Sequence, residues 1–398
     1  MKVKYINDDK VLGIKYDWGL IRKAYRALHC PADVYDPTTA PLEYCKYFVE
    51  SSERNIGKTT NWLLLGLCMH ELYGTVIEYV RQTEDMIMPK NTRTLFDTIL
   101  TFDYVSKVTD GAWNSVTYKS RFYYYCNVDD AGNIIEIDNK PFMHMCSVDK
   151  SEELKSGYNS PYGDLIIFDE FVGKYYYPNE FVYFADTCKT IMRSRRSPII
   201  VMLANTINPY SPYYNELMIY DDMQTMSIGD NKTVTTPLGT KLYVEIIGAV
   251  AEKKAKNEIL NKLFFGFKNP MLGSITGENW AIKPYQHIPE LAENEDVQTI
   301  SRQLYILYNN KIVRLDIVLH SSLGQCIYAH WATRTYEDSI IITAEDRLDK
   351  RYRYRYGTGA IEKYIKTMFA QNRFYYSHND VGQFIEAYFK YVDKLLVR

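Results

Sequence analysis

The sequence lacks the features that would place the chain in a membrane or in the secretory pathway. It has no run of about 18 apolar residues, so we expect no transmembrane helix. Its first ten residues carry charges where a signal peptide needs an apolar stretch, so we expect a cytoplasmic protein without a membrane partner. The 398 residues, 46% hydrophobic and 24% charged, are typical of a soluble chain with two globular domains.

The sequence also lacks paired metal-ligand motifs and a large net charge. The seven cysteines form no Cys-x-x-Cys motif and the seven histidines no His-x-x-x-His pair, so we expect buried free thiols and no zinc site. The formal net charge is −2, which by itself does not indicate a nucleic-acid partner. The C-terminal part, 297–398, is modestly basic, with 15 Lys and Arg against 10 Asp and Glu.

The strongest motif is a phosphate-binding loop. Residues 52–59 follow the pattern G-x-x-x-x-G-K-[ST], with Ser52 in place of the first glycine. A predicted strand at 44–49 precedes the loop, and a predicted helix at 58–70 and a strand at 75–80 follow it. This order is a βαβ unit of a parallel sheet.

The chemistry of such a loop predicts binding of ATP with Mg²⁺. Backbone N–H groups wrap the β-phosphate, Lys58 reaches the β- and γ-phosphate oxygens, and Thr59 places its hydroxyl on Mg²⁺. Arg54 either contacts the γ-phosphate of the same subunit or pairs with a nearby acid. The predicted nucleotide-binding residues are Ser52, Glu53, Arg54, Asn55, Ile56, Gly57, Lys58, Thr59 and Thr60.

A second motif supplies two acids at the end of a strand. Four apolar residues, 165–168, are followed by Asp169 and Glu170. Open α/β sheets bind ligands at the carboxyl ends of their strands, so we expect Asp169 to hold Mg²⁺ and Glu170 to polarise the attacking water. The alternative is a strand followed by a solvated turn.

Polar residues after two further elements extend the candidate site. Asn205 follows an apolar strand at 199–203 and could sense the γ-phosphate, unless it belongs to an ordinary turn. Arg193, Arg195 and Arg196 close a predicted helix that begins near residue 179. Cations suit any helix C-terminus, but these arginines could also reach the ATP of a neighbouring subunit in a ring.

The predicted elements define a fold class and domain boundaries. Apolar strands that alternate with helices predict an α/β domain with a mostly parallel sheet over 1–249. We expect a linker at 250–296 and a smaller α+β domain at 297–398, with three paired strands and two final helices. In the second domain 351–356 alternates Arg with Tyr, which suits either a nucleic-acid backbone or a solvated edge.

Six short segments recur together, in this order, in one protein family. The segments are Arg54-Asn55-Ile56-Gly57-Lys58-Thr59, Tyr79-Val80-Arg81, Ile167-Phe168-Asp169-Glu170-Phe171, Tyr177-Pro178-Asn179-Glu180, Met192-Arg193-Ser194-Arg195 and Asn208-Pro209-Tyr210. On these segments the sequence resembles the terminase-like genome-packaging ATPases of small tailed bacteriophages, most specifically over its first 215 residues.

The resemblance implies a fold, an activity and partners. It implies an additional-strand (ASCE) P-loop ATPase domain joined to an RNase H-like domain. The active form would be a homo-oligomeric ring, usually of five subunits, docked on the portal of an empty capsid in the host cytoplasm. The ring drives double-stranded DNA inward, and in some members a structural RNA bridges motor and capsid.

The resemblance also implies roles for single residues. Lys58 and Thr59 match the Walker A pair, and Asp169 and Glu170 match the Walker B metal ligand and catalytic acid. Arg193 matches the position of the finger that acts in trans, Arg195 is its near neighbour, and Asn205 lies in the coupling segment. By this resemblance we expect the chain to be an ATP hydrolase that translocates DNA.

The second domain is expected to bind without cutting. Larger terminases cleave DNA with an acidic metal cluster, but Asp316 has no convincing partners, since Asp338, Asp346 and Asp380 fall in turn-like contexts. Two alternatives stay open. One is a nucleotide-switched assembly or docking protein with slow hydrolysis, and the other is a terminase with an active nuclease.

Overall fold

The chain forms two compact units, which are described one at a time. The computed structural model describes residues 16–31, 34–52, 56–153, 164–172, 176, 179–192, 198–205, 210–248, 285–287, 297–343, 351–354 and 359–392. The first unit comprises 1–173, 179–207 and 221–258, and the second 174–178, 208–220 and 259–398. Within the described ranges, every helix is too short or too polar to cross a membrane.

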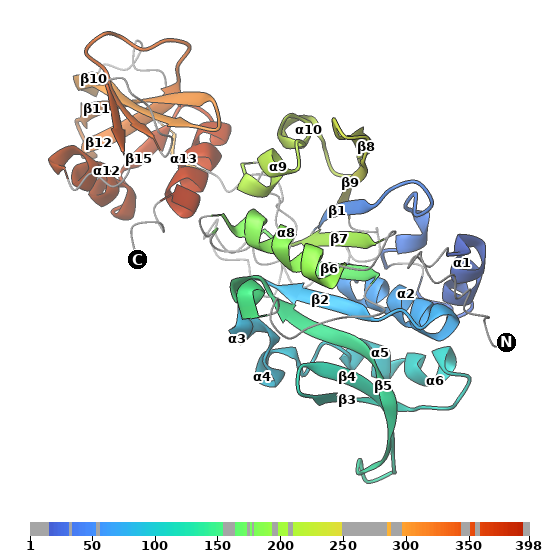
Figure 1. Ribbon diagram of the computed structural model, residues 1–398. Coiled ribbons are helices and arrows are strands. Elements are labelled where there is room, and N and C mark those ends of the chain that lie inside the picture. Colours follow the sequence, from blue (N-terminus) through green and yellow to red (C-terminus); the bar gives the residue numbers. More distant parts are fainter. Residues whose placement is uncertain are drawn as a thin grey trace. The chain divides into compact units, whose positions relative to one another are not determined.

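A nine-stranded sheet is the framework of the first unit (Figure 1). Its order is β3-β4-β5-β2-β6-β7-β1-β9-β8, and the six strands from β5 to β9 run parallel. Antiparallel strands extend the sheet at both edges. The bounds are β1 Tyr47–Ser52, β2 Ile77–Arg81, β3 Ser115–Lys119, β4 Phe122–Val128, β5 Ile134–Ser147, β6 Leu165–Asp169, β7 Ile199–Ala204, β8 Asn231–Thr235 and β9 Lys241–Ile247. The predicted α/β class with a mostly parallel sheet is confirmed.

Helices cover both faces of this sheet because its central strands are apolar on both sides. Tyr79 and Ile167 belong to the same core as α2 (Lys58–Tyr73). Phe168 points to the opposite face, where its ring stacks on Phe184 of α8 (Glu180–Ile191) with centroids 4.6 Å apart. Helices α2 and α8 therefore cover opposite faces (Figure 1). Both were predicted close to their observed bounds.

Several short helices in the first unit were not predicted, because four to six residues are too few to show helical periodicity. A nine-residue helix, α1, was missed as well; Asp17 caps it by accepting from the Leu20 N–H. These helices are α1 Trp18–Arg26, α3 Glu84–Ile87, α4 Pro89–Thr92, α5 Asp97–Thr101, α6 Tyr104–Val108 and α10 Tyr220–Thr225, with 3₁₀ turns at Pro37–Thr39 and Val148–Lys150.

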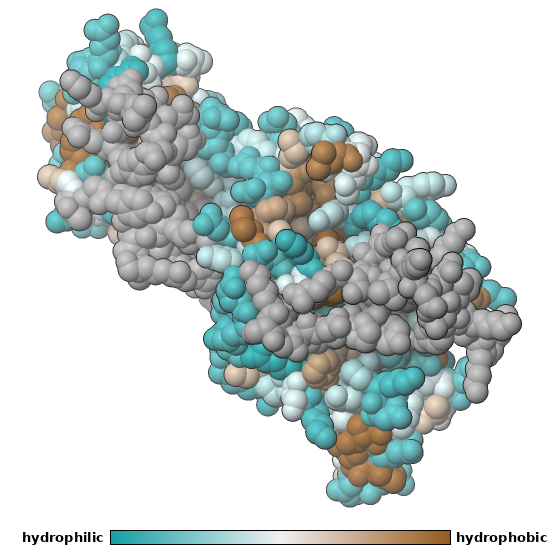
Figure 2. Space-filling model, in the orientation of Figure 1, coloured by the Kyte–Doolittle hydropathy of each residue, from teal (hydrophilic) through white to brown (hydrophobic). Residues whose placement is uncertain are grey.

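The hairpin of β4 and β5 projects beyond the rest of the sheet (Figure 1). Strand β5 has 14 residues against seven in β4. Near the turn, Ile134, Ile135 and Ile137 are 49%, 70% and 45% exposed, and they form an apolar tip (Figure 2).

The second unit contains a six-stranded sheet in the order β14-β13-β10-β11-β12-β15. Strands β10, β11 and β12 form the predicted antiparallel meander, whereas β13 and β14 run parallel to β10. The turn at Asn309-Asn310 has both residues at positive φ. The bounds are β10 Val297–Tyr308, β11 Lys311–His320, β12 Gly324–Trp331, β13 Ile340–Thr343, β14 Tyr352–Tyr354, β15 Phe374–Tyr376, α12 Ala360–Ala370 and α13 Asn379–Val392.

Residues 208–220 follow the first unit's strand β7 in sequence, yet they pack in the second unit. Tyr210 is 2% exposed in a core shared with Tyr308 and Phe384. Lys311 Nζ lies 5.5–5.6 Å from the ring centroids of Tyr210, Tyr220 and Trp331. This segment, which includes α9 (Pro212–Glu216), falls inside the predicted first domain, 1–249. Most of the predicted linker, 250–296, lies outside the described residues, so its limits stay a prediction.

Candidate active site

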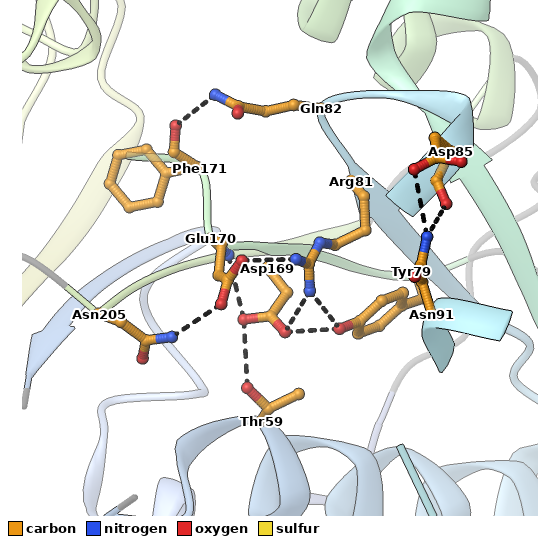
Figure 3. Close-up of polar contacts among 10 residues, drawn as sticks. All are labelled: Thr59, Tyr79, Arg81, Gln82, Asp85, Asn91, Asp169, Glu170, Phe171 and Asn205. Atoms are coloured by element: carbon orange, nitrogen blue, oxygen red, sulfur yellow. Dashed lines mark hydrogen bonds and ion pairs between the residues drawn. The ribbon is translucent and has the colours of Figure 1, made fainter. Parts of the chain in front are cut away.

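The ends of three neighbouring strands meet the start of α2 in the first unit (Figure 3). Ser52 ends β1, Asp169 ends β6 and Asn205 follows β7. Parallel strands bring their carboxyl ends to one edge of a sheet, which is where open α/β folds bind ligands. The predicted phosphate loop, acid pair and sensor residue are thereby brought together.

The loop itself turns into α2 at Gly57. Gly57 has φ +86°, and a Cβ there would lie 2.9 Å from Asn61 Nδ2. Lys58 is 4% exposed, and its Nζ donates to Ser52 Oγ and, over 3.2 Å, to Asn205 Oδ1. Ser52, the departure from the glycine pattern, therefore contacts the motif lysine directly. The predicted residues Glu53, Arg54 and Asn55 lie outside the described residues.

The two carboxylate oxygens of Asp169 accept hydrogen bonds from two different sets of donors. Its Oδ1 accepts from the Thr59 hydroxyl and from the Glu170 backbone N–H, both over 3.1 Å. Its Oδ2 accepts from the Tyr79 hydroxyl over 2.5 Å and from Arg81 Nη1 over 3.4 Å. The hydroxyl and carboxylate predicted to bind Mg²⁺ thus face each other.

Glu170 is held at both carboxylate oxygens as well. Arg81 Nη2 donates to Oε2 over 2.5 Å, and Asn205 Nδ2 donates to Oε1 over 3.2 Å. The residue has φ +54°, a left-handed conformation that is uncommon for a residue with a Cβ. Backbone strain of this kind concentrates at functional sites, where the surrounding contacts maintain it.

Tyr79 and Arg81 were not predicted as site residues, although both occur in one of the recurring segments. They lie on β2, which pairs with β6 and therefore ends beside the acid pair. Burial lowers the pKa of Arg81, but the interactions with Tyr79, Asp169 and Glu170 have the larger effect, so the pKa of the arginine is raised. Burial and the Asp169 charge also raise the pKa of Tyr79, so its phenol stays a donor. These two residues can be placed at the site only when the order of the strands in the sheet is known, and the spacing of residues along the chain does not give that order.

A cavity of about 330 Å³ opens beside the loop. Gly57 and Thr60, both predicted nucleotide-binding residues, lie in its wall, and Asn61 adds an amide. The remaining lining is mostly apolar or aromatic: Cys30, Pro31, Val34, Leu64, Thr98, Phe102 and Tyr104. Its volume is within the usual range for small-molecule sites. Sequence reasoning missed this cavity because its walls come from three separate segments.

A buried carboxyl supports the strand that leads to the loop. Glu50 on β1 is fully buried, and it accepts from the Tyr35 hydroxyl and from Trp62 Nε1, both over 2.7 Å. Burial, opposed by these hydrogen bonds, raises the pKa of Glu50 to about 8. The strand before the loop therefore carries a group that titrates near neutral pH.

A second polar cluster lies inside the sheet, away from the strand ends. Glu78, His144 and Cys146 are buried on the adjacent strands β2 and β5. His144 Nδ1 lies 2.9 Å from Glu78 Oε2 and 3.1 Å from Cys146 Sγ. These mutual hydrogen bonds account for the burial of three polar groups.

The remaining predicted residues are not brought into this site. Arg193, Arg195 and Arg196 lie outside the described residues. In the second unit, Asp316 is buried, with Oδ1 2.9 Å from Arg314 Nε and Oδ2 3.3 Å from His330 Nε2. Asp338 accepts from Gln303, Asp380 accepts from Trp331, and Asp346 lies outside the described residues.

Comparison with known proteins identifies the fold. No family model matches the sequence, and no curated protein matches it. Two solved structures match 90% of the chain, each with a TM-score of 0.50. One is described as the Phi-28 gp11 DNA packaging motor, with 15% identity and 98% of its own chain covered. The other is the bacteriophage Phi-29 viral genome packaging motor assembly, with 14% identity and 99% covered. The predicted resemblance to packaging ATPases is confirmed at the level of the fold.

Proposed function

We propose that this chain, which shares its fold with phage DNA packaging motor proteins, is an ATP-hydrolysing motor subunit that moves double-stranded DNA into an empty capsid. The observation that carries the proposal is the meeting of Lys58 and Thr59 with Asp169, Glu170 and Asn205 at one sheet edge. This set contains a phosphate-binding cation, two Mg²⁺ ligands, a general base and a polar sensor.

The oxygen donors fit Mg²⁺. Thr59 Oγ1 and Asp169 Oδ1 lie 3.1 Å apart, and a hydroxyl with a carboxylate is a ligand set that this hard cation accepts together with water and phosphate oxygens. When bound, the ion would neutralise charge on the β- and γ-phosphates. Tyr79 would hold the other oxygen of Asp169, so that the carboxylate keeps one orientation.

The described contacts support a sequence of events during ATP binding. Lys58 Nζ would leave Ser52 and Asn205 to reach the β- and γ-phosphate oxygens. Glu170 would then accept a proton from the attacking water. The side-chain carbonyl of Asn205, no longer bonded to Lys58, would respond to the presence of the γ-phosphate. The cavity lined by Thr60, Phe102 and Tyr104 would hold the adenine and ribose.

Chain connectivity supports coupling of hydrolysis to movement. Asn205 is followed, five residues later, by Tyr210, which is buried in the core of the second unit. Tyr176, six residues after Glu170, packs against the same core. Both strands that carry the hydrolysis residues therefore lead directly into the second unit.

The assembly and the second domain complete the proposal. The working form would be a ring, five subunits in the resembling family, in which Arg193 or its neighbour Arg195 completes the next subunit's site. The ring would dock on a capsid portal in the host cytoplasm, with or without a structural RNA. The meander and parallel strands of the second unit are compatible with an RNase H-like fold, and Asp316 pairs with Arg314 instead of another acid, which favours binding without cleavage.

ATP hydrolysis by the full chain, measured with and without double-stranded DNA, tests this function. We expect hydrolysis that DNA stimulates, and we expect Glu170→Gln to bind ATP but lose turnover. Hydrolysis that DNA does not change would favour a nucleotide-switched docking protein. DNA cleavage with Mn²⁺ that disappears in Asp316→Ala would show an active nuclease and overturn the proposed role of the second domain.

A further inference from the structure

Three side chains that can each ligate a metal ion converge inside the nine-stranded sheet. Glu78, His144 and Cys146 are 0%, 4% and 1% exposed. A carboxylate oxygen of Glu78, Nδ1 of His144 and Sγ of Cys146 all lie within 4.8 Å of one another. Among the residues that the structure describes, no other three His, Cys, Asp or Glu side chains converge in this way.

Strand pairing produces this arrangement. Strand β2 runs parallel to β5, and the register places Glu78 opposite His144 and Val80 opposite Cys146 (Figure 1). Side chains alternate between the faces of a sheet, so His144 and Cys146, two positions apart, point to the same face. The ring of Phe122 stacks on the His144 ring with centroids 4.5 Å apart and fixes its plane. Side chains held on paired strands are placed more precisely than side chains on loops.

The distances between the three ligand atoms are close to those of a tetrahedral zinc site. His144 Nδ1 lies 2.9 Å from Glu78 Oε2 and 3.1 Å from Cys146 Sγ, and Sγ lies 3.5 Å from the same oxygen. Bonds of about 2.0–2.3 Å at tetrahedral angles place two zinc ligands roughly 3.3–3.7 Å apart. The two shorter contacts need to widen by only about 0.5 Å to hold an ion in place of the hydrogens that the three groups now share.

The mixture of ligands selects the kind of cation. Mg²⁺ and Ca²⁺ take oxygen ligands, whereas a set of thiolate, imidazole and carboxylate suits zinc. The site is also separate from the proposed Mg²⁺ ligands. Glu78 directly precedes Tyr79, whose side chain lies on the other face of the sheet, in the core with α2.

We propose that Glu78, His144 and Cys146 form a structural zinc site, in which the ion joins β2 to β5. The Cys146 thiol would give up its proton to solvent as the ion binds, and water would take the fourth ligand position. Zinc has no redox chemistry, so the ion would act by cross-linking two strands of the sheet. The expectation of no zinc site depended on spacing along the chain, and Glu78 lies 66 positions from His144.

The zinc content of the full chain, produced without an affinity tag in zinc-supplemented medium, tests the site. We expect a single zinc ion per chain. Loss of even an outer-shell contact costs about 10–100-fold in metal affinity, so Cys146→Ser and His144→Gln should each weaken zinc binding at least about 100-fold. Cys126→Ser is the matched control, because Cys126 is another buried free cysteine, on the adjacent strand β4. It should keep the zinc.

Replacement of zinc by cobalt shows whether the sulfur is a ligand. Cobalt bound to a thiolate gives an intense near-ultraviolet charge-transfer absorption, which we expect in the wild type and in Cys126→Ser but not in Cys146→Ser. A wild type that binds no zinc, zinc retained by Cys146→Ser, or a cobalt band that survives in Cys146→Ser would each overturn the proposal. Circular dichroism verifies folding, and Glu78→Gln, which keeps a hydrogen bond to the imidazole, serves if Cys146→Ser does not fold.

Thermal unfolding tests the structural role of the ion. A ligand at about 100 times its Kd raises the melting temperature of a domain of this size by roughly 5–10 °C. We expect 1,10-phenanthroline, added with excess Mg²⁺, to lower the melting temperatures of the wild type and Cys126→Ser by this amount and to leave that of Cys146→Ser unchanged. A wild type whose melting temperature does not respond to the chelator would show that the ion does not stabilise the sheet.

Discussion

The side-chain carbonyl of Asn205 accepts a hydrogen bond from Lys58 Nζ over 3.2 Å, across 147 positions of sequence. The amide nitrogen of the same side chain donates to Glu170. Asn205 thus lies between the predicted phosphate-binding lysine and the predicted general base. A bound γ-phosphate would take Lys58 away from Asn205, so we expect this side chain to be the point at which the nucleotide state is sensed.

Replacement of Asn205 should therefore separate binding from turnover. We expect Asn205→Ala to lower kcat about tenfold or more, because Glu170 loses the donor on Oε1, while ATP affinity changes less than threefold. Equilibrium binding and steady-state hydrolysis on the same preparation measure both quantities. An unchanged kcat with weakened binding would instead make Asn205 a simple nucleotide contact.

The loop should tolerate no side chain at Gly57. In Gly57→Ala the methyl group would meet Asn61 Nδ2 at 2.9 Å, in a backbone conformation that costs alanine about 1–2 kcal/mol. We expect ATP affinity to fall at least tenfold, as followed with a fluorescent analogue. Gly132→Ala is the control, since Gly132 has φ +83° with open space around it. Its backbone cost is the same, but its ATP affinity should be that of the wild type.

The buried carboxyl of Glu50 should make stability depend on pH. Its pKa is raised from 4.5 to about 8, so the folded state favours the protonated form. The stability it contributes is fully present below pH 4.5 and declines as the pH rises toward 8, by an amount on the order of 5 kcal/mol. Glu50→Gln should remove this decline, with the Tyr35 hydroxyl accepting from the new amide.

Urea unfolding at pH 5.0, 6.5 and 8.0 measures this effect. The difference in unfolding free energy between Glu50→Gln and the wild type should grow in favour of the variant as the pH rises. Glu43→Gln is the control, because the Arg22 hydrogen bond lowers the pKa of Glu43 and its titration therefore lies below this range. Parallel wild-type and Glu50→Gln curves would contradict the assignment.

Mixed rings should reveal the trans-acting arginine. Rings of Arg193→Ala subunits alone, or of Glu170→Gln subunits alone, should not hydrolyse ATP. In a mixture, an intact Glu170 can face an intact Arg193 across a subunit interface, so part of the DNA-stimulated activity should return. No recovery at any ratio would indicate that Arg193 acts within its own subunit, and the same experiment with Arg195→Ala identifies which arginine is the finger.

Much of the candidate site could be predicted from the sequence. Lys58 and Thr59 lie in one loop, and Asp169 and Glu170 directly follow four apolar residues. Each motif therefore consists of residues that are adjacent in the sequence and can be recognised without knowledge of the fold. Arg81 could not be assigned in this way. It meets Glu170 across 89 positions, and only the pairing of β2 with β6 makes them neighbours.

The sequence by itself determined the parallel α/β sheet and identified the candidate phosphate loop and acid pair, because hydrophobic runs and the chemistry of short motifs are local properties. The tertiary structure decided which polar side chains meet at the strand ends, where the cavity beside Thr60 opens, and that 208–220 packs in the second unit. These relations depend on strand order and on contacts between distant segments. Spacing along a single chain does not specify either of them, since the same run of strands is compatible with more than one order in a sheet.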